Sequence, residues 1–142
     1  MSRSEEWRSA AHALAGRLGT PIAVLSIVTE NAPTPGHDVR AAQGRYLEEF
    51  ARGAVGAGAI VDGAGFRASF VRAVVAGVTA LARYKCPFRI AATDEEMAAW
   101  LGARFATLPA SAARPTVSEL CSFFAQTRAH LAAQPRVLVA QR

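Results

Sequence analysis

The chain has 142 residues, of which 51% are hydrophobic and 19% are charged, and its formal net charge is +5 at pH 7. This length suits one domain with its own hydrophobic core, and the apolar content excludes an intrinsically disordered chain. No stretch reaches the roughly 18–20 apolar residues that span a bilayer, since even the weakly polar run 68–82 contains Arg72.

The distribution of charges and cysteines argues against a nucleic-acid partner, a secreted protein and a metal site. The arginines are spread along the chain without a block of like charge, which argues against nucleic acid as a partner. No apolar run follows a basic start, so we expect a cytoplasmic protein without a secretory signal. Cys86 and Cys121 share no metal-ligand spacing with each other or with a histidine, so we expect two reduced core thiols, no metal and no cofactor.

The first part of the chain predicts a helix, a strand and a loop. Apolar residues recur at three- and four-residue spacing over 4–18, which indicates one helical face. The run 22–28 is apolar and rich in β-branched residues, as expected of a strand covered on both faces. Proline and glycine mark 31–37 as a loop.

The middle of the chain predicts an amphipathic helix, a second buried strand and a long helix. Asp38 can cap the amphipathic helix, which runs to about Arg52. We expect the glycine-rich stretch 53–58 to break it and residues 59–62 to form the strand. The long helix is expected over 66–84, after the turn Gly63-Ala64-Gly65.

The last part predicts a third strand at 88–92 and two capped helices. Thr93 and Glu96 have the spacing of a capping box, as do Thr116 and Glu119. The apolar stripe of the first of these helices comprises Met97, Trp100, Leu101 and Phe105. A linker is expected over 108–115, and the tail 136–140 reads either as a short edge strand or as a frayed end.

Alternation of strands and helices predicts an α/β fold with a small, mainly parallel sheet of three to four strands and helices packed on it. We expect a single domain over 1–142, with its core at 20–106 and terminal helices at 4–18 and 116–133. A three-stranded sheet buries one face well. We therefore expect the terminal helices to cover the remaining surface or to mediate self-association as a homo-oligomer.

The strongest local motif is the glycine turn, because residues 63–68 match GxGxxA between a strand and a helix. Such glycines let a backbone approach a pyrophosphate at a helix N-terminus. A dinucleotide-binding fold also needs an acidic residue about 20 positions on, whereas Asp94 lies farther along and belongs to a capping box. A tight strand-to-helix turn that requires glycine is the favoured interpretation.

Ligands and partners of open α/β sheets bind at the carboxyl ends of parallel strands. We therefore predict a partner- or anion-binding region, here termed the strand-end surface, behind the middle strand. It comprises Asp62, Gly63, Gly65, Phe66, Arg67, Ser69 and Arg72. Asp38 and Thr93 are expected neighbours.

Structural roles for the same residues stay open. Asp62 and Ser69 can satisfy backbone donors at the helix start. Arg72 interrupts an apolar helix and can pair internally with a carboxylate such as Asp62 or Glu96. Trp100 is expected in the core, and no catalytic constellation is readable, so the chain is not expected to be an enzyme.

A resemblance to known proteins adds to this interpretation. The residues that carry it are Gly65-Phe66, Ser69, Arg72, Pro87, Thr93, Glu96, Trp100 and Leu101. Their spacing resembles small uncharacterised α/β proteins common in myxobacteria, and the element order over 20–106 resembles STAS domains of the anti-sigma-factor-antagonist type. The chain departs from that family in lacking an Asp-Ser-Ser-Gly-like motif and in having one strand where a pair is expected.

STAS domains are non-catalytic switches that bind a partner protein, and many carry a phosphorylatable Ser or Thr at the start of the helix after a central strand. The resemblance implies a protein-interaction or regulatory module, with Ser69 as the counterpart of the phosphorylated residue. The alternative function is a small-anion or nucleotide binder that uses the Gly63–Gly65 turn and Arg67.

Overall fold

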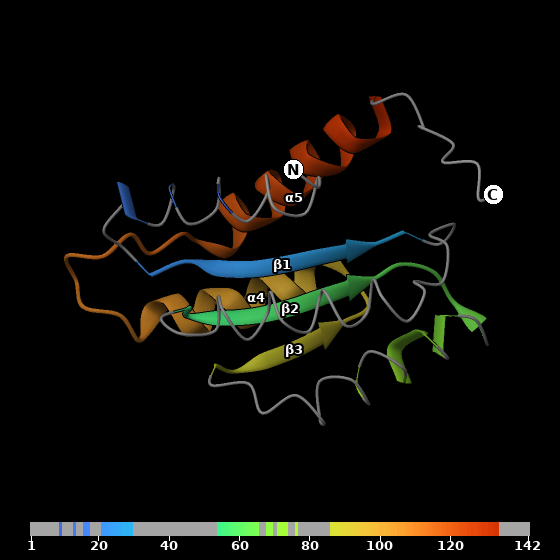
Figure 1. The fold of residues 1–142 in the computed structure, drawn as a ribbon, viewed down its shortest axis with the longest axis horizontal. Coiled ribbons are helices and arrows are strands. Elements are labelled where there is room, and N and C mark those ends of the chain that lie inside the picture. Colours follow the sequence, from blue (N-terminus) through green and yellow to red (C-terminus); the bar gives the residue numbers. More distant parts are fainter. Residues whose placement is uncertain are drawn as a thin grey trace.

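The computed structural model describes residues 21–29, 54–65 and 86–133, together with residues 9, 13, 16, 17, 68, 69, 71–73 and 76. Within these residues three strands form one parallel sheet in the order β1-β2-β3. The strands are β1 (Ala23–Val28), β2 (Gly56–Val61) and β3 (Phe88–Ala91). The predicted α/β class and the small parallel sheet are thus confirmed (Figure 1).

The register places β2 between the other two strands. Ala23 lies opposite Gly56 and Val28 opposite Val61, while Ala57 pairs with Phe88 on the other side of β2. All six residues of β2 are buried, as predicted for this strand. The strand β1, which we expected to be covered on both faces, is only partly buried and exposes Ser26. The middle strand therefore ends, at Val61, directly before the predicted strand-end surface.

The start of β2 corrects one prediction. We expected the glycines of 53–58 to form a break, but the strand already begins at Gly56. A Cβ added at Gly56 would lie 2.8 Å from Cη2 of Trp100, and one added at Gly58 would lie 2.7 Å from Cε of Met97. These glycines let a helix pack directly on the strand, a tertiary requirement that local composition does not reveal.

Two helices follow the sheet, and both begin at predicted capping boxes. In α4 (Asp94–Ala106), Oγ1 of the N-cap Thr93 accepts from the Glu96 N–H at 3.2 Å. The Glu96 carboxylate accepts from the Ala92 N–H, one residue before the cap. In α5 (Val117–Ala133) the exchange is reciprocal, because the Thr116 N–H donates to Glu119 and the Glu119 N–H donates to Thr116.

The helices α4 and α5 pack against the same hydrophobic cluster as the sheet. In Figure 1, α4 passes behind β2, and α5 runs beside β1. The buried members of the cluster are Ile60, Ala91, Met97, Ala98, Leu101, Leu120 and Phe124. Partly buried Trp100 and Phe105 pack against it, so the predicted stripe of α4 is confirmed and Trp100 is a core residue.

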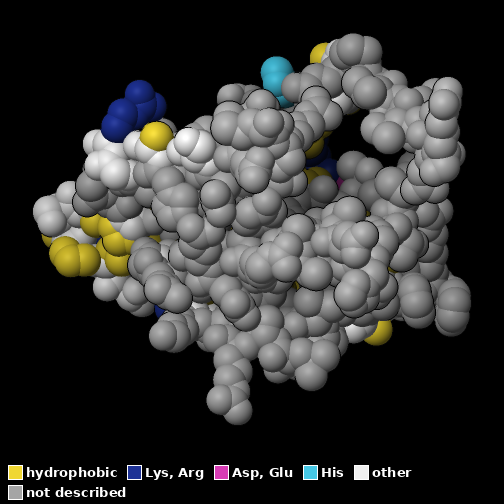
Figure 2. Space-filling model, in the orientation of Figure 1, with side chains coloured by type: hydrophobic (Ala, Val, Ile, Leu, Met, Phe, Trp, Pro, Cys, Tyr) yellow, Lys and Arg dark blue, Asp and Glu magenta, His cyan; other side chains and the backbone are white. Residues whose placement is uncertain are grey.

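The connection between α4 and α5 is irregular, as predicted. Residues 107–116 form neither helix nor strand, and the Ala112 N–H donates to the Pro109 carbonyl at 3.0 Å. In Figure 2, hydrophobic side chains gather at the left-hand end of the visible face, where this connection lies in Figure 1.

The structure describes only a few residues of the other predicted helices. Ser9, Ala13, Gly16 and Arg17 are helical and exposed. Their spacing places them on one face, opposite the predicted apolar face of helix 4–18. The predictions for 31–37, 38–52 and 136–140 lie outside the described residues.

A second, smaller cluster lies on the other face of the sheet. It contains buried Ala57 and Cys86, with Val24, Ala54 and Phe88 packed against them. Cys86 is buried and Cys121 is half-buried, and both are free, which agrees with the predicted core thiols. None of the described helices is long and apolar enough to cross a membrane.

Candidate functional site

The turn after β2 has the backbone geometry that its glycines predicted. Gly63 and Gly65 have φ angles of 94° and 84°, in the region that favours glycine over residues with a side chain. Both are exposed, as is Ala64 between them. Gly65, Ala68 and Ser69 are already helical, so the described backbone turns from strand to helix within a few residues.

Arg72 ties the helix after this turn to the end of β2. Its Nη2 donates to the Gly63 carbonyl at 2.9 Å and, more weakly, to the Val61 carbonyl at 3.4 Å. Its Nε is buried and has no hydrogen-bond partner in the structure. The expected pairing with Asp62 or Glu96 is therefore corrected, because the hydrogen bonds of Arg72 go to backbone carbonyls.

Asp62 pairs with an arginine that sequence reasoning did not single out. Arg128 of α5 donates from Nη1 and Nη2 to the two Asp62 carboxylate oxygens, at 2.7 and 2.8 Å. The same guanidinium donates to Asp94, from Nη2 at 2.7 Å and from Nε at 2.9 Å. We term Arg128, Asp62 and Asp94 the Arg128 cluster. It joins the end of β2, the start of α4 and the second half of α5.

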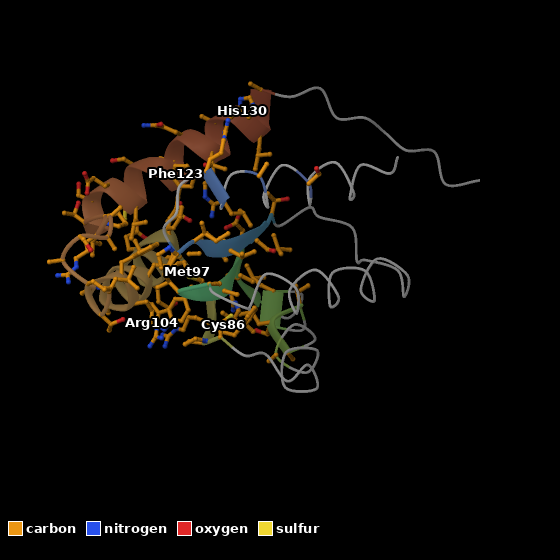
Figure 3. All side chains as sticks on the ribbon, turned by 60° about the vertical axis from the view of Figure 1, so that its left-hand side comes forward. Cys86, Met97, Arg104, Phe123 and His130 are labelled. Atoms are coloured by element: carbon orange, nitrogen blue, oxygen red, sulfur yellow. The ribbon has the colours of Figure 1, made fainter. Side chains whose placement is uncertain are left out.

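The direction of the helices explains why these three residues meet. The chain turns back after β3, so α4 starts at the carboxyl ends of the strands. The next helix, α5, runs back toward that edge (Figures 1 and 3). The hydrogen bonds to Asp62 and Asp94 place Arg128 there. In Figure 3, Phe123 and His130 lie along α5, while Met97 lies between α4 and the sheet.

The Arg128 cluster is half-buried and carries one net negative charge. The side chains of Arg128, Asp62 and Asp94 are 29%, 27% and 20% exposed. Hydrogen bonds first to Asp94 and then to Asp62 raise the pKa of Arg128 above its already high ordinary value. Paired contacts of this kind use the planar guanidinium in a way that lysine cannot reproduce.

The sequence contains a signal that Arg128 has an acidic partner. It follows Leu120 and Phe124 at four-residue spacing, so it lies on the buried stripe of α5. An arginine on an apolar stripe needs an acidic partner. The partners could not be read from the sequence, because Asp62, Asp94 and Arg128 lie far apart in the chain.

The other predicted site residues have mixed outcomes. Ser69 is helical and exposed. Thr93 caps α4 beside Asp94, so it lies near the strand-end surface as expected. The Asp62 carboxylate accepts from Arg128, whereas the structural alternative that the sequence left open was a pairing with backbone donors. Phe66, Arg67 and Asp38 lie outside the described residues.

Two further groups, Glu96 and Cys86, have shifted pKa values. Glu96 pairs with Arg89 at 2.7 Å, and the Ala92 N–H, followed by Arg89, lowers the pKa of the Glu96 carboxyl. Burial raises the pKa of the Cys86 thiol, which disfavours the reactive thiolate. The described residues contain no group of three or more acidic, histidine or cysteine side chains that could hold a metal ion. At the strand-end surface, the hydrogen bonds of Arg72 and Arg128 join β2 to the helix that follows it, to α4 and to α5.

Comparison of the chain with protein-family models, with curated proteins and with solved structures found no match.

Proposed function

We propose that the protein is a non-enzymatic interaction or regulatory module of STAS-like type, which binds a partner protein through the strand-end surface around residues 62–72. The supporting observation is that this surface has an exposed turn, Gly63–Gly65, and that Arg72 and the neighbouring Arg128 of α5 are already hydrogen-bonded to internal acceptors. Ser69, Ala73 and Ala76 are exposed on the helix that follows the turn. Small exposed side chains of this kind on one helical face suit contact with a protein surface.

Anion or nucleotide binding is the second candidate and has less support. Arg128 is shared by two carboxylates, and Arg72 donates to backbone carbonyls. The N-terminus of α4 is lined by its own Thr93, Asp94 and Glu96. An incoming phosphate would meet the negative charge of Asp62 and Asp94, although helix N-termini otherwise favour anions.

Ser69 is the proposed point of regulation. It is exposed and lies within the first turns of the helix after the central strand. Two added negative charges near a helix start are favoured by the helix dipole. We propose that phosphorylation of Ser69 changes the affinity for the partner.

A binding comparison between two exposed alanines tests the partner surface. Ala73→Arg places a large charged side chain on the proposed surface, whereas Ala99→Arg places the same side chain on the exposed side of α4. We expect Ala73→Arg to reduce capture of a partner from source-cell lysate by about ten-fold or more, as loss of a central contact does. Ala99→Arg should bind like the unmodified protein.

Equal capture by both variants would contradict the proposed surface. A thermal-shift screen with nucleotides and inorganic phosphate tests the second candidate in parallel. A ligand at about a hundred times its Kd adds roughly 2.7 kcal/mol of stability, so binding would be visible. A clear shift would favour the anion-binding alternative.

A further inference from the structure

Leu120, Phe124 and Arg128 lie on one stripe of α5 and contact other elements of the domain. Leu120 and Phe124 are buried in the main hydrophobic cluster, and Arg128 follows one turn later. None of the residues 125–133 is buried, although all of them are described, and 129–133 are exposed throughout. The first half of α5 is therefore held by apolar burial and the second half is not.

Arg128 ties the second half of α5 to the domain by charge. Arg128 forms its ion pairs with Asp62 and Asp94, on two other elements. The hydrogen bond of Thr127 Oγ1 goes to the Phe123 carbonyl within the helix. Helix ends open at low cost where few apolar contacts hold them, so we expect the ion pairs of the Arg128 cluster to contribute to holding this end on the sheet edge.

We propose that Arg128 is a latch that closes residues 125–133 of α5 over the end of β2, and that weakening its ion pairs opens this helix end while Leu120 and Phe124 stay buried. In the closed state Arg128 occupies both carboxylates. In the open state Asp62 and Asp94 face solvent beside the exposed Gly63–Gly65 turn. The latch concerns the chain alone and does not depend on the proposed partner.

Ion pairs and apolar burial respond differently to added salt, and this difference makes the latch testable. Ion pairs that are partly exposed are screened by salt, whereas burial of Leu120 and Phe124 is not weakened by it. Added sodium chloride should therefore loosen the second half of α5 before the first half.

Hydrogen exchange of the full chain, read by mass spectrometry, measures this opening directly. We expect Arg128→Met to make amides of 125–133 exchange about ten-fold faster, which corresponds to about 1.4 kcal/mol. Exchange at 94–106 should be unchanged. Arg89→Met is the matched control, because it removes the ion pair with Glu96 at the same sheet edge without touching α5.

Two results would overturn the latch. One is unchanged exchange at 125–133 in Arg128→Met. The other is equally accelerated exchange over 94–106 and 125–133, which would make the cluster a support of the whole domain. Arg128→Lys should give an intermediate rate, because lysine keeps the charge but lacks the paired geometry. These measurements contain no partner, so their failure leaves the lysate comparison of Ala73→Arg and Ala99→Arg unaffected.

Discussion

Gly63 and Gly65 both adopt positive φ angles at the end of the middle strand, and both are exposed. In this region a Cβ clashes with the backbone of its own residue, so the requirement for glycine is local. Arg72 then holds the turn through the Gly63 carbonyl. At the scale of single residues, the shape of the strand-end surface thus depends on two missing side chains and one arginine.

Gly65→Ala should destabilise the protein by about 1–2 kcal/mol through backbone strain. No atom lies within 4 Å of a Cβ built at Gly65, so packing does not contribute to the loss. Urea denaturation of the two proteins measures the difference. Gly16→Ala is the control, since Gly16 is helical, exposed and equally free of contacts, and this change should be neutral or stabilising. A neutral Gly65→Ala would mean that the turn is not strained.

At the scale of elements, the two capping boxes decide where α4 and α5 begin. Each uses a threonine oxygen to satisfy a free N–H of the first turn. In α5 the Glu119 carboxylate also accepts from the Thr116 N–H and hydroxyl, at 2.7 and 2.8 Å. The start of α5 is therefore fixed locally, before Leu120 and Phe124 bring the helix onto the core.

This cap gives the stability of the protein a component that depends on pH. Hydrogen bonds from the Thr116 N–H, and then from its hydroxyl, lower the pKa of Glu119. Because the folded pKa lies below the unfolded value of about 4.3, the stabilisation is present above that value and is lost as the pH falls through the folded one. Glu119→Gln should therefore lose less stability than the unmodified protein between about pH 6 and about pH 3.

Urea midpoints at the two pH values measure this difference. If the two proteins lose equal stability on acidification, the Glu119 cap does not contribute in the folded state.

At the scale of the whole molecule, close packing of α4 on β2 and the Arg128 cluster join elements that are distant in the chain. Gly56 and Gly58 leave room for Trp100 and Met97, so the helix lies directly on the middle strand. Arg128, in the second half of α5, then connects this helix with the end of β2 and the start of α4. Both features arise only when the layers assemble.

Gly56→Ala should destabilise the protein by about 1–3 kcal/mol, because the new methyl group would lie 2.8 Å from Trp100. Trp100→Phe removes the two ring atoms nearest to that position, so the double variant should recover part of the loss. A double-mutant cycle from urea denaturation measures this coupling. Gly58→Ala is the control, since its methyl group would also lie 2.9 Å from the Arg89 carbonyl, which Trp100→Phe cannot relieve. Strict additivity of Gly56→Ala and Trp100→Phe would contradict direct contact.

The sequence by itself determined the α/β class, three of the strands, both capped helices and the glycine turn. These features follow from periodicity, capping chemistry and backbone sterics, all of which act over a few neighbouring residues. The stripe of α4 and the core position of Trp100 were predicted for the same reason. The position of Asp62 at the end of the middle strand also followed from local order.

Tertiary structure alone decided the true start of β2, the acceptors of Arg72 and the pairing of Arg128. From the sequence, Gly56 was interpreted as part of a break, and only the structure shows that this glycine leaves room for Trp100. From the sequence, Asp94 was interpreted only as part of a helix cap, and only the structure shows that Arg128 of α5 donates to both Asp94 and Asp62. Each of these contacts joins residues far apart in the chain, and the direction in which α4 and α5 run across the sheet, which brings them together, is set by packing of the assembled core.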